Sequence, residues 1–119
     1  MTAWPGREGG TRLTAAEAAQ LAYEFQVLAD PTRLRILSFA AERMPEPTTV
    51  TALVAELRLS QSTVSHHVKV LLDAGYLTVQ RAGTWSLYRP VAEALTAVAQ
   101  RIAPQWPAAS VEPKAATTA

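Results

Sequence analysis

Apolar residues recur at helical spacing in the first part of the chain, and this pattern predicts two helices. The first is expected from Ala15 to about Leu28, because Thr14 and Glu17 form a capping-box pattern at its start. Its apolar positions fall on one stripe: Ala18, Leu21, Ala22, Phe25 and Leu28. Such a stripe suits either a subunit interface or a core contact within one chain.

The second helix is expected to begin at Pro31, with Asp30 as its N-cap, and to run to about Arg43. Pro45 and Pro47 then prevent its continuation. Its apolar positions cover a broad face: Leu34, Ile36, Leu37, Phe39, Ala40 and Ala41. This breadth predicts a helix at the centre of the fold.

A short helix, a tight connection and a longer amphipathic helix follow. Residues 51–57 form the short helix, and residues 58–60 leave only a tight turn. Ser60 is a good N-cap for a helix from about Gln61 to Ala74. Its apolar stripe is Val64, Val68, Leu71 and Leu72, and its polar side is Ser62, Ser65, His66, Lys69 and Asp73. The first side is expected to pack, and the second to meet solvent or a ligand.

Two strands are predicted after Gly75, which ends the preceding helix. Residues 76–79 give the first strand, residues 81–84 the turn and residues 85–88 the return strand. Apolar residues return to helical spacing from Val91 to Ile102, which predicts a last helix that ends before Pro104.

The predicted fold class is therefore mainly α with a small β-hairpin wing, a winged helix-turn-helix in which four helices, two strands and a fifth helix follow one another. The domain is expected over residues 13–103, and residues 1–12 and 104–119 are expected to be flexible tails. The polar side of the helix after Ser60 predicts a DNA-reading surface. The alternative is a helix and a hairpin that only fill a small core.

Composition limits the classes of function. At 119 residues with 49% hydrophobic content, the chain is expected to be one domain that gains buried area from a partner subunit. Without cysteine it has no disulfide and no thiolate metal site. No apolar run resembles a membrane span or a signal peptide, so we expect a cytoplasmic protein. The net charge is only +1, but Arg58, Lys69, Arg81 and Arg89 outnumber Asp73 around the proposed DNA-facing surface.

Three runs of the sequence resemble the ArsR/SmtB family of bacterial repressors: residues 27–37 (VLADPTRLRIL), 59–71 (LSQSTVSHHVKVL) and 73–76 (DAGY). The likeness covers about residues 20–100. It implies a homodimeric winged-helix repressor that binds operator DNA, with its first and last helices forming the dimer interface. Many members of this family release DNA when a metal ion binds.

The metal ligands of that family are missing at the matching positions. One family site has a Cys-Val-Cys type run where this chain has Thr49-Val50-Thr51, and threonine hydroxyls cannot replace thiolates. A second family site uses residues of the last helix, where this chain has Ala92, Glu93, Ala94 and Gln105. We therefore expect no metal ion and no cofactor at either site.

The two histidines are adjacent, so they do not form a metal site by themselves, because facing helical partners lie three or four residues apart. His66 is interpreted as a DNA contact rather than as a merely solvated residue, and His67 as a packing residue with one hydrogen bond. An open alternative is a nickel or zinc site in which Glu17, Glu24 or Asp30 joins a histidine or the terminal amine.

Groove geometry assigns a role to each candidate site residue. Two recognition helices of a two-fold dimer would enter successive major grooves of a pseudo-palindromic operator, about 34 Å apart. The residues expected to read base edges are Gln61, Ser62, Ser65 and His66. The residues expected to hold phosphates are Thr63, Lys69 and Arg81. Thr84 stands where the resembled family often has a second wing arginine, which weakens the expected wing contact.

Other classes of function stay open from the sequence. One is a winged-helix module that binds a protein partner and no DNA. Without an internal metal sensor, a regulator would bind constitutively, take an organic ligand in its dimer, or depend on a second protein that carries the metal ligands. No nucleophile with its base, phosphate loop or metal cluster is evident, so we do not expect an enzyme.

Overall fold

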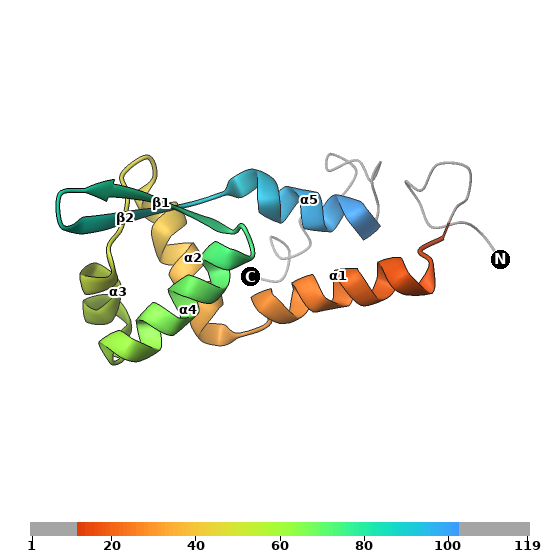
Figure 1. Ribbon diagram of the computed structural model, residues 1–119, viewed down its shortest axis with the longest axis horizontal. Helices are drawn as coiled ribbons and strands as arrows, with labels where there is room; N and C mark the ends of the chain where they lie inside the picture. Colours follow the sequence, from red (N-terminus) through yellow and green to blue (C-terminus); the bar gives the residue numbers. More distant parts are fainter. Residues whose placement is uncertain (1–11, 103–119) are drawn as a thin grey trace, which may run out of the picture.

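The computed structural model describes residues 12–102, which form five helices and a two-stranded antiparallel hairpin (Figure 1). In chain order the elements are α1 (Ala15–Leu28), α2 (Pro31–Arg43), α3 (Val50–Leu57), α4 (Gln61–Asp73), β1 (Leu77–Ala82), β2 (Trp85–Pro90) and α5 (Ala92–Ile102). The predicted fold class and the order of its elements are confirmed. The tails predicted over residues 1–12 and 104–119 lie, except for Arg12, outside the described residues.

Polar caps set where the first two helices begin. The Thr14 hydroxyl accepts from the Glu17 amide at 3.1 Å, and the Glu17 carboxylate accepts from the Thr14 amide at 2.8 Å. Both bonds of the predicted capping box are thus present. The Asp30 carboxylate accepts from the backbone amides of Thr32 and Arg33 at 2.8 and 3.1 Å, which starts α2 at Pro31 as predicted.

The connection between α3 and α4 is the tight turn that the sequence predicts. Thr49 caps α3, so this helix begins at Val50, one residue before the expected start. Arg58 ends it with a left-handed backbone (φ 58°), a conformation that non-glycine residues adopt at a cost. Ser60 then caps α4. The reversal holds α3 against α4 as a helix-turn-helix.

The hydrophobic core lies between α2, α3, α4 and the start of β1, and α4 packs against the other three. The most deeply buried side chains include Ile36, Leu53, Val64, Leu71 and Tyr76. The inward stripe predicted for α4 is buried, except that Leu72 is only half-buried. Because one side of α4 is buried in this core, the orientation of the helix is fixed.

The apolar face of α2 is narrower than the sequence suggested. Ile36, Leu37 and Ala40 are buried, but Leu34 is 51% exposed and Ala41 is exposed as well. Because α3, α4 and β2 cover α2 on one side only, they leave part of its apolar surface uncovered. α2 contacts α3, α4 and β2, as expected of a central helix, but part of its broad apolar face is exposed.

The wing is longer than expected. Ala82 pairs with Trp85, so the loop consists only of Gly83 and Thr84, and Gly83 has the positive φ (64°) that a two-residue hairpin loop needs. The prediction that the turn begins at Arg81 was wrong, because so short a loop lets the strands pair up to its edge.

The hairpin is also joined to the segment before α3. The backbones of Thr48 and Tyr88 exchange two hydrogen bonds, of 2.9 and 2.8 Å, in an isolated antiparallel bridge. This contact anchors β2 to the body of the fold at the end of the hairpin away from its loop.

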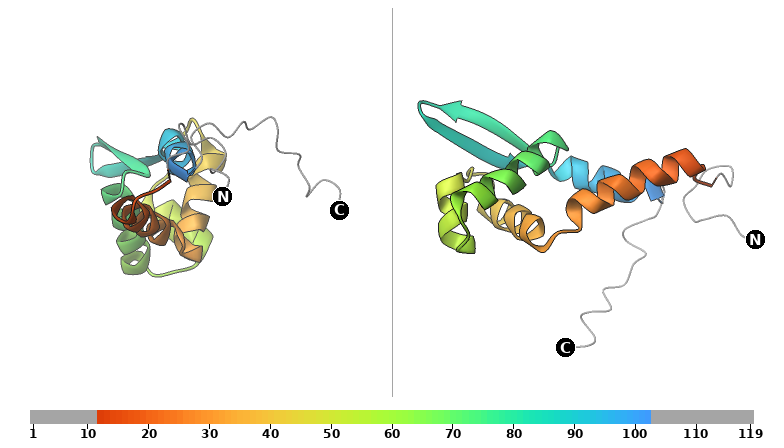
Figure 2. Two further views of the ribbon diagram at one scale, coloured as in Figure 1. Left: turned by 90° about the vertical axis from the view of Figure 1, so that its right-hand side faces the viewer. Right: turned by 60° about the horizontal axis from the view of Figure 1, so that its bottom comes forward.

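α1 and α5 lie side by side and extend away from the helix-turn-helix, as the views in Figures 1 and 2 show. Arg101 of α5 donates a hydrogen bond to the Glu24 carboxylate of α1. Large apolar side chains nevertheless stay exposed at this end: Tyr23 is 60% exposed, Phe25 39% and Leu95 38%.

The stripe predicted along α1 is only partly covered within one chain. Leu21 is buried and Leu28 half-buried, whereas Ala18, Ala22 and Phe25 are exposed. Val27, which lies outside the predicted stripe, is buried instead. Within residues 12–102, no helix combines the length and the apolar character that crossing a membrane would require.

Candidate nucleic-acid interface

The first two turns of α4 carry the residues that the sequence assigned to base reading. The exposed ones are Gln61, Ser62 and His66, and Ser65 is half-buried. They face outward because the opposite side of the helix is buried in the core. One helix therefore brings all four side chains onto a single outer surface, which we call the α4 polar face.

Hydroxyl groups gather at the N-terminus of α4. The Ser60 Oγ accepts from the Thr63 amide at 3.1 Å, donates to the Thr63 hydroxyl at 2.9 Å and lies 3.3 Å from the Ser62 hydroxyl. A helix N-terminus carries partial positive charge and free backbone amides, a setting that attracts phosphate. Thr63 thus lies in the first turn of α4, and its contact with phosphate stays a prediction.

Gln61 and Ser65 keep their hydrogen-bonding capacity. Neither side chain forms a hydrogen bond within the part of the chain that the structure describes. A glutamine amide can present one donor and one acceptor to the edge of an adenine. The α4 polar face therefore offers unused donors and acceptors on a rigid support.

Lys69 lies one turn further along α4, and its Nζ is 3.1 Å from the Asp73 carboxylate. Both side chains are well exposed, at 74% and 61%. Exposed pairs of this spacing contribute little to stability, so the pair opens at low cost. Lys69 therefore stays available for a phosphate.

The wing holds Arg81 in an extended position on β1. Its guanidinium donates to the Ser86 hydroxyl on the paired residue of β2 at 3.1 Å, and Arg81 is exposed. Because Arg81 belongs to the strand and not to the turn, its side chain is supported by the sheet. The loop itself carries Thr84 and no charge.

Arg89, which the sequence places among the basic residues around the proposed DNA-facing surface, forms hydrogen bonds within the fold, and its place on that surface stays a prediction. Its Nε donates to the Pro45 carbonyl at 3.0 Å, and its Nη1 donates to the Gln80 side chain at 2.9 Å. These bonds hold the guanidinium against the loop after α2. Arg58, in contrast, is exposed at the turn between α3 and α4.

The two histidines lie in different surroundings, as expected. Their rings meet edge to face with centroids 5.3 Å apart; His66 is exposed, while His67 is half-buried and receives a hydrogen bond from Arg33 at 3.1 Å. Burial lowers the pKa of His67, with further lowering by the nearby charge of Arg33 and an opposing effect of Asp30. The interpretation of His67 as a packing residue with one hydrogen bond is confirmed.

The carboxylates considered for a metal site have other partners. Glu17 belongs to the cap of α1, Glu24 binds Arg101, and Asp30 caps α2. Within residues 12–102, no three His, Cys, Asp or Glu side chains come together in a way that could hold a metal ion. The terminal amine and Gln105 lie outside the described residues.

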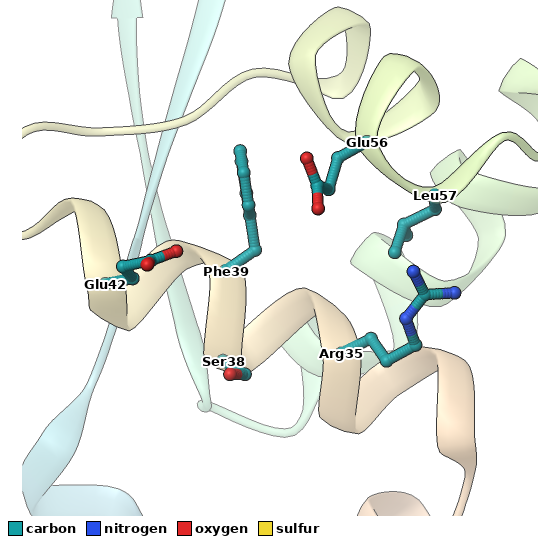
Figure 3. A pocket seen from close by; sticks show the side chains of 6 residues that line it. All are labelled: Arg35, Ser38, Phe39, Glu42, Glu56 and Leu57. Carbon is teal, nitrogen blue, oxygen red and sulfur yellow. The ribbon is translucent and has the colours of Figure 1, made fainter.

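A hollow of about 170 Å³ lies between α2 and α3 (Figure 3). It is lined by Arg35, Ser38, Phe39, Glu42, Glu56 and Leu57. Figure 3 shows the Phe39 ring between the two carboxylates, with Arg35 at the other end near Leu57. Two carboxylates against one guanidinium repel phosphate, so we do not count this hollow as part of the nucleic-acid interface.

Comparison with known proteins agrees with this geometry. A family model described as "Bacterial regulatory protein, arsR family" matches residues 30–79. These residues begin at the cap of α2, contain the whole helix-turn-helix and end in β1.

The likeness extends further in individual relatives. The HTH-type transcriptional regulator NmtR of Mycobacterium tuberculosis is 39% identical over 90 residues, 70% of this chain and 72% of the relative. The crystal structure of the AntR antimony-specific transcriptional repressor has a TM-score of 0.64 at 31% identity, covering 81% of this chain and 86% of that chain. The homodimeric winged helix-turn-helix DNA-binding domain of Mb0332 from Mycobacterium bovis, a possible ArsR-family regulator, has a TM-score of 0.59 at 25% identity, covering 75% and 83%.

Proposed function

The chain belongs to the arsR family of bacterial regulatory proteins, and from this premise we propose that it is a repressor that binds a pseudo-palindromic operator as a homodimer. Membership establishes DNA-binding transcriptional regulation. The family consists of transcriptional regulators, not of enzymes. We also propose that it acts at the chromosome, in the cytoplasm.

The observation that carries the proposal is the state of the α4 polar face. Gln61 and Ser65 present unused hydrogen-bonding groups, while the other side of the same helix is locked in the core. A reading element must be rigid and must keep its donors and acceptors unoccupied until DNA arrives. The first half of α4 meets both requirements.

We assign the reading of base edges to Gln61, Ser62, Ser65 and His66, with Gln61 suited to a bidentate contact with adenine. Thr63, Lys69 and Arg81 hold phosphates and fix the register of the protein on the duplex. Thr63 does so beside the free amides of the α4 N-terminus, and Arg81 does so from the wing.

The two-fold assembly is supported by the opposite end of the molecule. Phe25 of α1 and Leu95 of α5 leave apolar side chains exposed at this end, and exposed apolar surface is typical of a site of association. The structurally similar domain of Mb0332 is homodimeric. Pairing of α1 and α5 with their copies places the two α4 helices on opposite sides of a two-fold axis, as a palindromic operator requires.

A releasing signal cannot act through a thiolate of this chain, since the sequence has no cysteine. Nickel or zinc bound by histidine and carboxylate groups, an organic ligand in the dimer and a metal-bearing partner protein are the routes to be separated by experiment. The same experiment that tests operator binding separates the first route from the other two.

The test is fluorescence anisotropy of a labelled duplex from the region upstream of the gene, at fixed salt, against a shuffled duplex of the same composition. We expect tight, salt-sensitive binding to the first and binding at least about 1,000-fold weaker to the second. Equal affinity for both duplexes would reject sequence-specific regulation and favour a winged-helix module for a protein partner. Addition of nickel, zinc or cobalt ions then shows whether a metal weakens the specific complex.

A further inference from the structure

Arg33 joins three helices through one side chain. It projects from the first turn of α2, and its Nε donates to the Val27 carbonyl at 2.6 Å. Its Nη2 is 3.5 Å from the Gln26 carbonyl, and its Nη1 is 3.1 Å from Nδ1 of His67 on α4. A single guanidinium therefore caps the C-terminal end of α1 and holds the recognition helix to it.

The bond to His67 has a definite chemical requirement. A guanidinium only donates hydrogen bonds, so Nδ1 of His67 must be the unprotonated nitrogen of a neutral ring, with its proton on Nε2. When the ring is protonated, Nδ1 becomes a donor and the ring becomes a second cation beside Arg33. Protonation therefore removes an attraction and adds a repulsion at the same point.

Charged or titratable groups face His67 from three elements. These are Asp30 in the connection between α1 and α2, Arg33 on α2 and His66 on α4. Burial lowers the pKa of His67 below its usual 6.5, the charges of Arg33 and His66 act in the same direction, and Asp30 opposes them. The neutral ring is thus the form that the fold prefers above about pH 6.5.

We propose that Arg33 is a positioning residue for operator binding: it fixes the angle of α4 relative to α1 through His67, and protonation of His67 releases this link and weakens the complex with DNA. The inference rests on the proposed function, because α1 matters to DNA only as part of the dimer. With α1 at the two-fold axis, a bond from its end to α4 sets the spacing and tilt of the two recognition helices. A palindromic operator is bound tightly only if both the spacing and the tilt match its two half-sites.

The first experiment compares Arg33→Gln with Arg35→Gln in operator binding at about pH 7.5. Arg35 lies on the same helix, is exposed and forms no hydrogen bond or ion pair within residues 12–102, so its replacement removes the same charge without removing the link. We expect Arg33→Gln to weaken operator binding about tenfold and Arg35→Gln less than about twofold. Arg33→Lys should recover only part of the loss, because an ammonium lacks the planar fork that reaches both the carbonyls and the ring. Equal effects of the two glutamine variants would overturn the positioning role.

The second experiment is a pH profile that a purely structural role of Arg33 would not change. Protonation of His66 adds positive charge to the α4 polar face, so the profile is measured in the His66→Gln background. We expect this variant to lose operator affinity by about threefold or more as pH falls from about 7.5 to about 5.5. Adding His67→Gln keeps a hydrogen-bond acceptor for Arg33 but removes the titration, and the profile should become flat. If operator affinity falls equally at low pH in the variants with and without His67, protonation of His67 does not control DNA binding.

A third measurement needs no DNA and separates failure of this inference from failure of the proposed function. The ¹⁵N chemical shifts of the His67 ring at neutral pH should show an unprotonated Nδ1 and a protonated Nε2 in the wild type. In Arg33→Gln that preference should weaken. A proton on Nδ1 of the wild-type ring would contradict the link even if operator binding is strong, whereas an intact link with no specific DNA binding would contradict the repressor and the positioning role that rests on it.

Discussion

The two ends of this molecule expose different kinds of surface. One end exposes polar groups, and the other exposes apolar side chains. At the helix-turn-helix end, the α4 polar face presents hydrogen-bonding groups that have no partners within the described residues, as Gln61 and Ser65 do. At the other end, α1 and α5 present exposed apolar side chains, with Phe25 and Leu95 more than a third exposed. The chemistry of each surface indicates its partner: base edges and phosphates for the first, a second copy of the chain for the second.

This difference assigns different energetic roles to the two ends. In the proposed dimer, the apolar end supplies affinity by joining two reading units, since a second half-site contact becomes intramolecular once the dimer has formed. The polar end supplies discrimination, because each unmatched donor or acceptor in a wrong sequence has a cost. Substitutions at the two ends should therefore change operator affinity in different patterns.

The largest effect is expected from a charge placed in the apolar end. Phe25→Glu should dissociate the dimer and weaken operator binding about 100-fold, because two separate half-site contacts replace one linked complex. Sedimentation equilibrium gives the oligomeric state and anisotropy gives the affinity. Gln26→Glu places the same charge one residue further along α1, outside the apolar stripe, and should leave both quantities nearly unchanged. If Phe25→Glu stays dimeric, α1 is not part of the interface.

Gln61→Ala should reduce the free energy of operator binding by about 1 to 3 kcal/mol while leaving binding to a shuffled duplex nearly unchanged. The variant removes only a side chain that has no hydrogen-bond partner among residues 12–102, so its stability should match that of the wild type. Gln26→Ala, an exposed glutamine on α1, is the matched control. Equal losses on operator and shuffled DNA would show that Gln61 contacts phosphate and reads no base.

Asp30 lies in the connection between α1 and α2, which joins the two ends, and it caps α2. Hydrogen bonds from the backbone amides, with that of Arg33 first, and the charge of His67 lower the pKa of Asp30 despite the opposing effect of burial. A carboxyl whose folded pKa lies below its unfolded value of 3.8 stabilises the fold above that pH, and this contribution is lost as pH falls through the folded pKa.

We therefore expect Asp30→Ala to lower the free energy of unfolding at neutral pH by about 1 kcal/mol, through loss of the α2 cap. Asp30→Asn keeps a capping oxygen but should flatten the loss of stability below about pH 4. Urea denaturation across the acid range measures both. Asp73→Asn, which removes an exposed carboxylate outside any helix cap, is the control, and an unchanged acid limb in Asp30→Asn would refute the assignment.

The smallest effect is expected at Lys69. Lys69→Ala should weaken binding to operator and shuffled DNA alike, by about threefold, and reduce the slope of log affinity against log salt by about one unit for each protomer. The matching substitution Arg35→Ala removes a positive charge from α2, beside the hollow between α2 and α3, and should leave the slope intact. A salt slope that Lys69→Ala does not change would exclude a phosphate contact.

The elements were predictable from the sequence wherever a local pattern determines them. The capping box at Thr14, the Asp30-Pro31 start and the Ser60 cap each act within a few residues, so the beginnings of α1, α2 and α4 follow from the sequence directly. The outward direction of Gln61 and His66 also follows, because the helical period fixes which side a buried stripe leaves for the polar residues.

The contacts that tie the elements together were not predictable in this way. Arg33 and His67 are separated by 34 residues, and Arg89 and the Pro45 carbonyl by 44. Each contact depends on how helices and strands pack, which no local period encodes. The hydrogen bonds of Arg89, which counts in the sequence only as a charge near the DNA-facing surface, could not be read from its local pattern.

Exposure depends on packing in the same way. Leu34 has the spacing of a core residue on α2, yet it is 51% exposed and none of the elements described over residues 12–102 covers it. A helical period shows which residues share a face, but it does not show whether another element lies against that face.

The claim that joins the two ends is that one dimer reads two half-sites at a fixed spacing. It is tested most directly by measuring anisotropy with the native operator and with an operator whose half-sites are separated by about five additional base pairs, half a turn of the duplex. The account predicts that the insertion lowers affinity about 100-fold, because one α4 helix then faces the wrong side of the DNA. Equal affinity for the two duplexes would contradict a rigid two-fold reading unit.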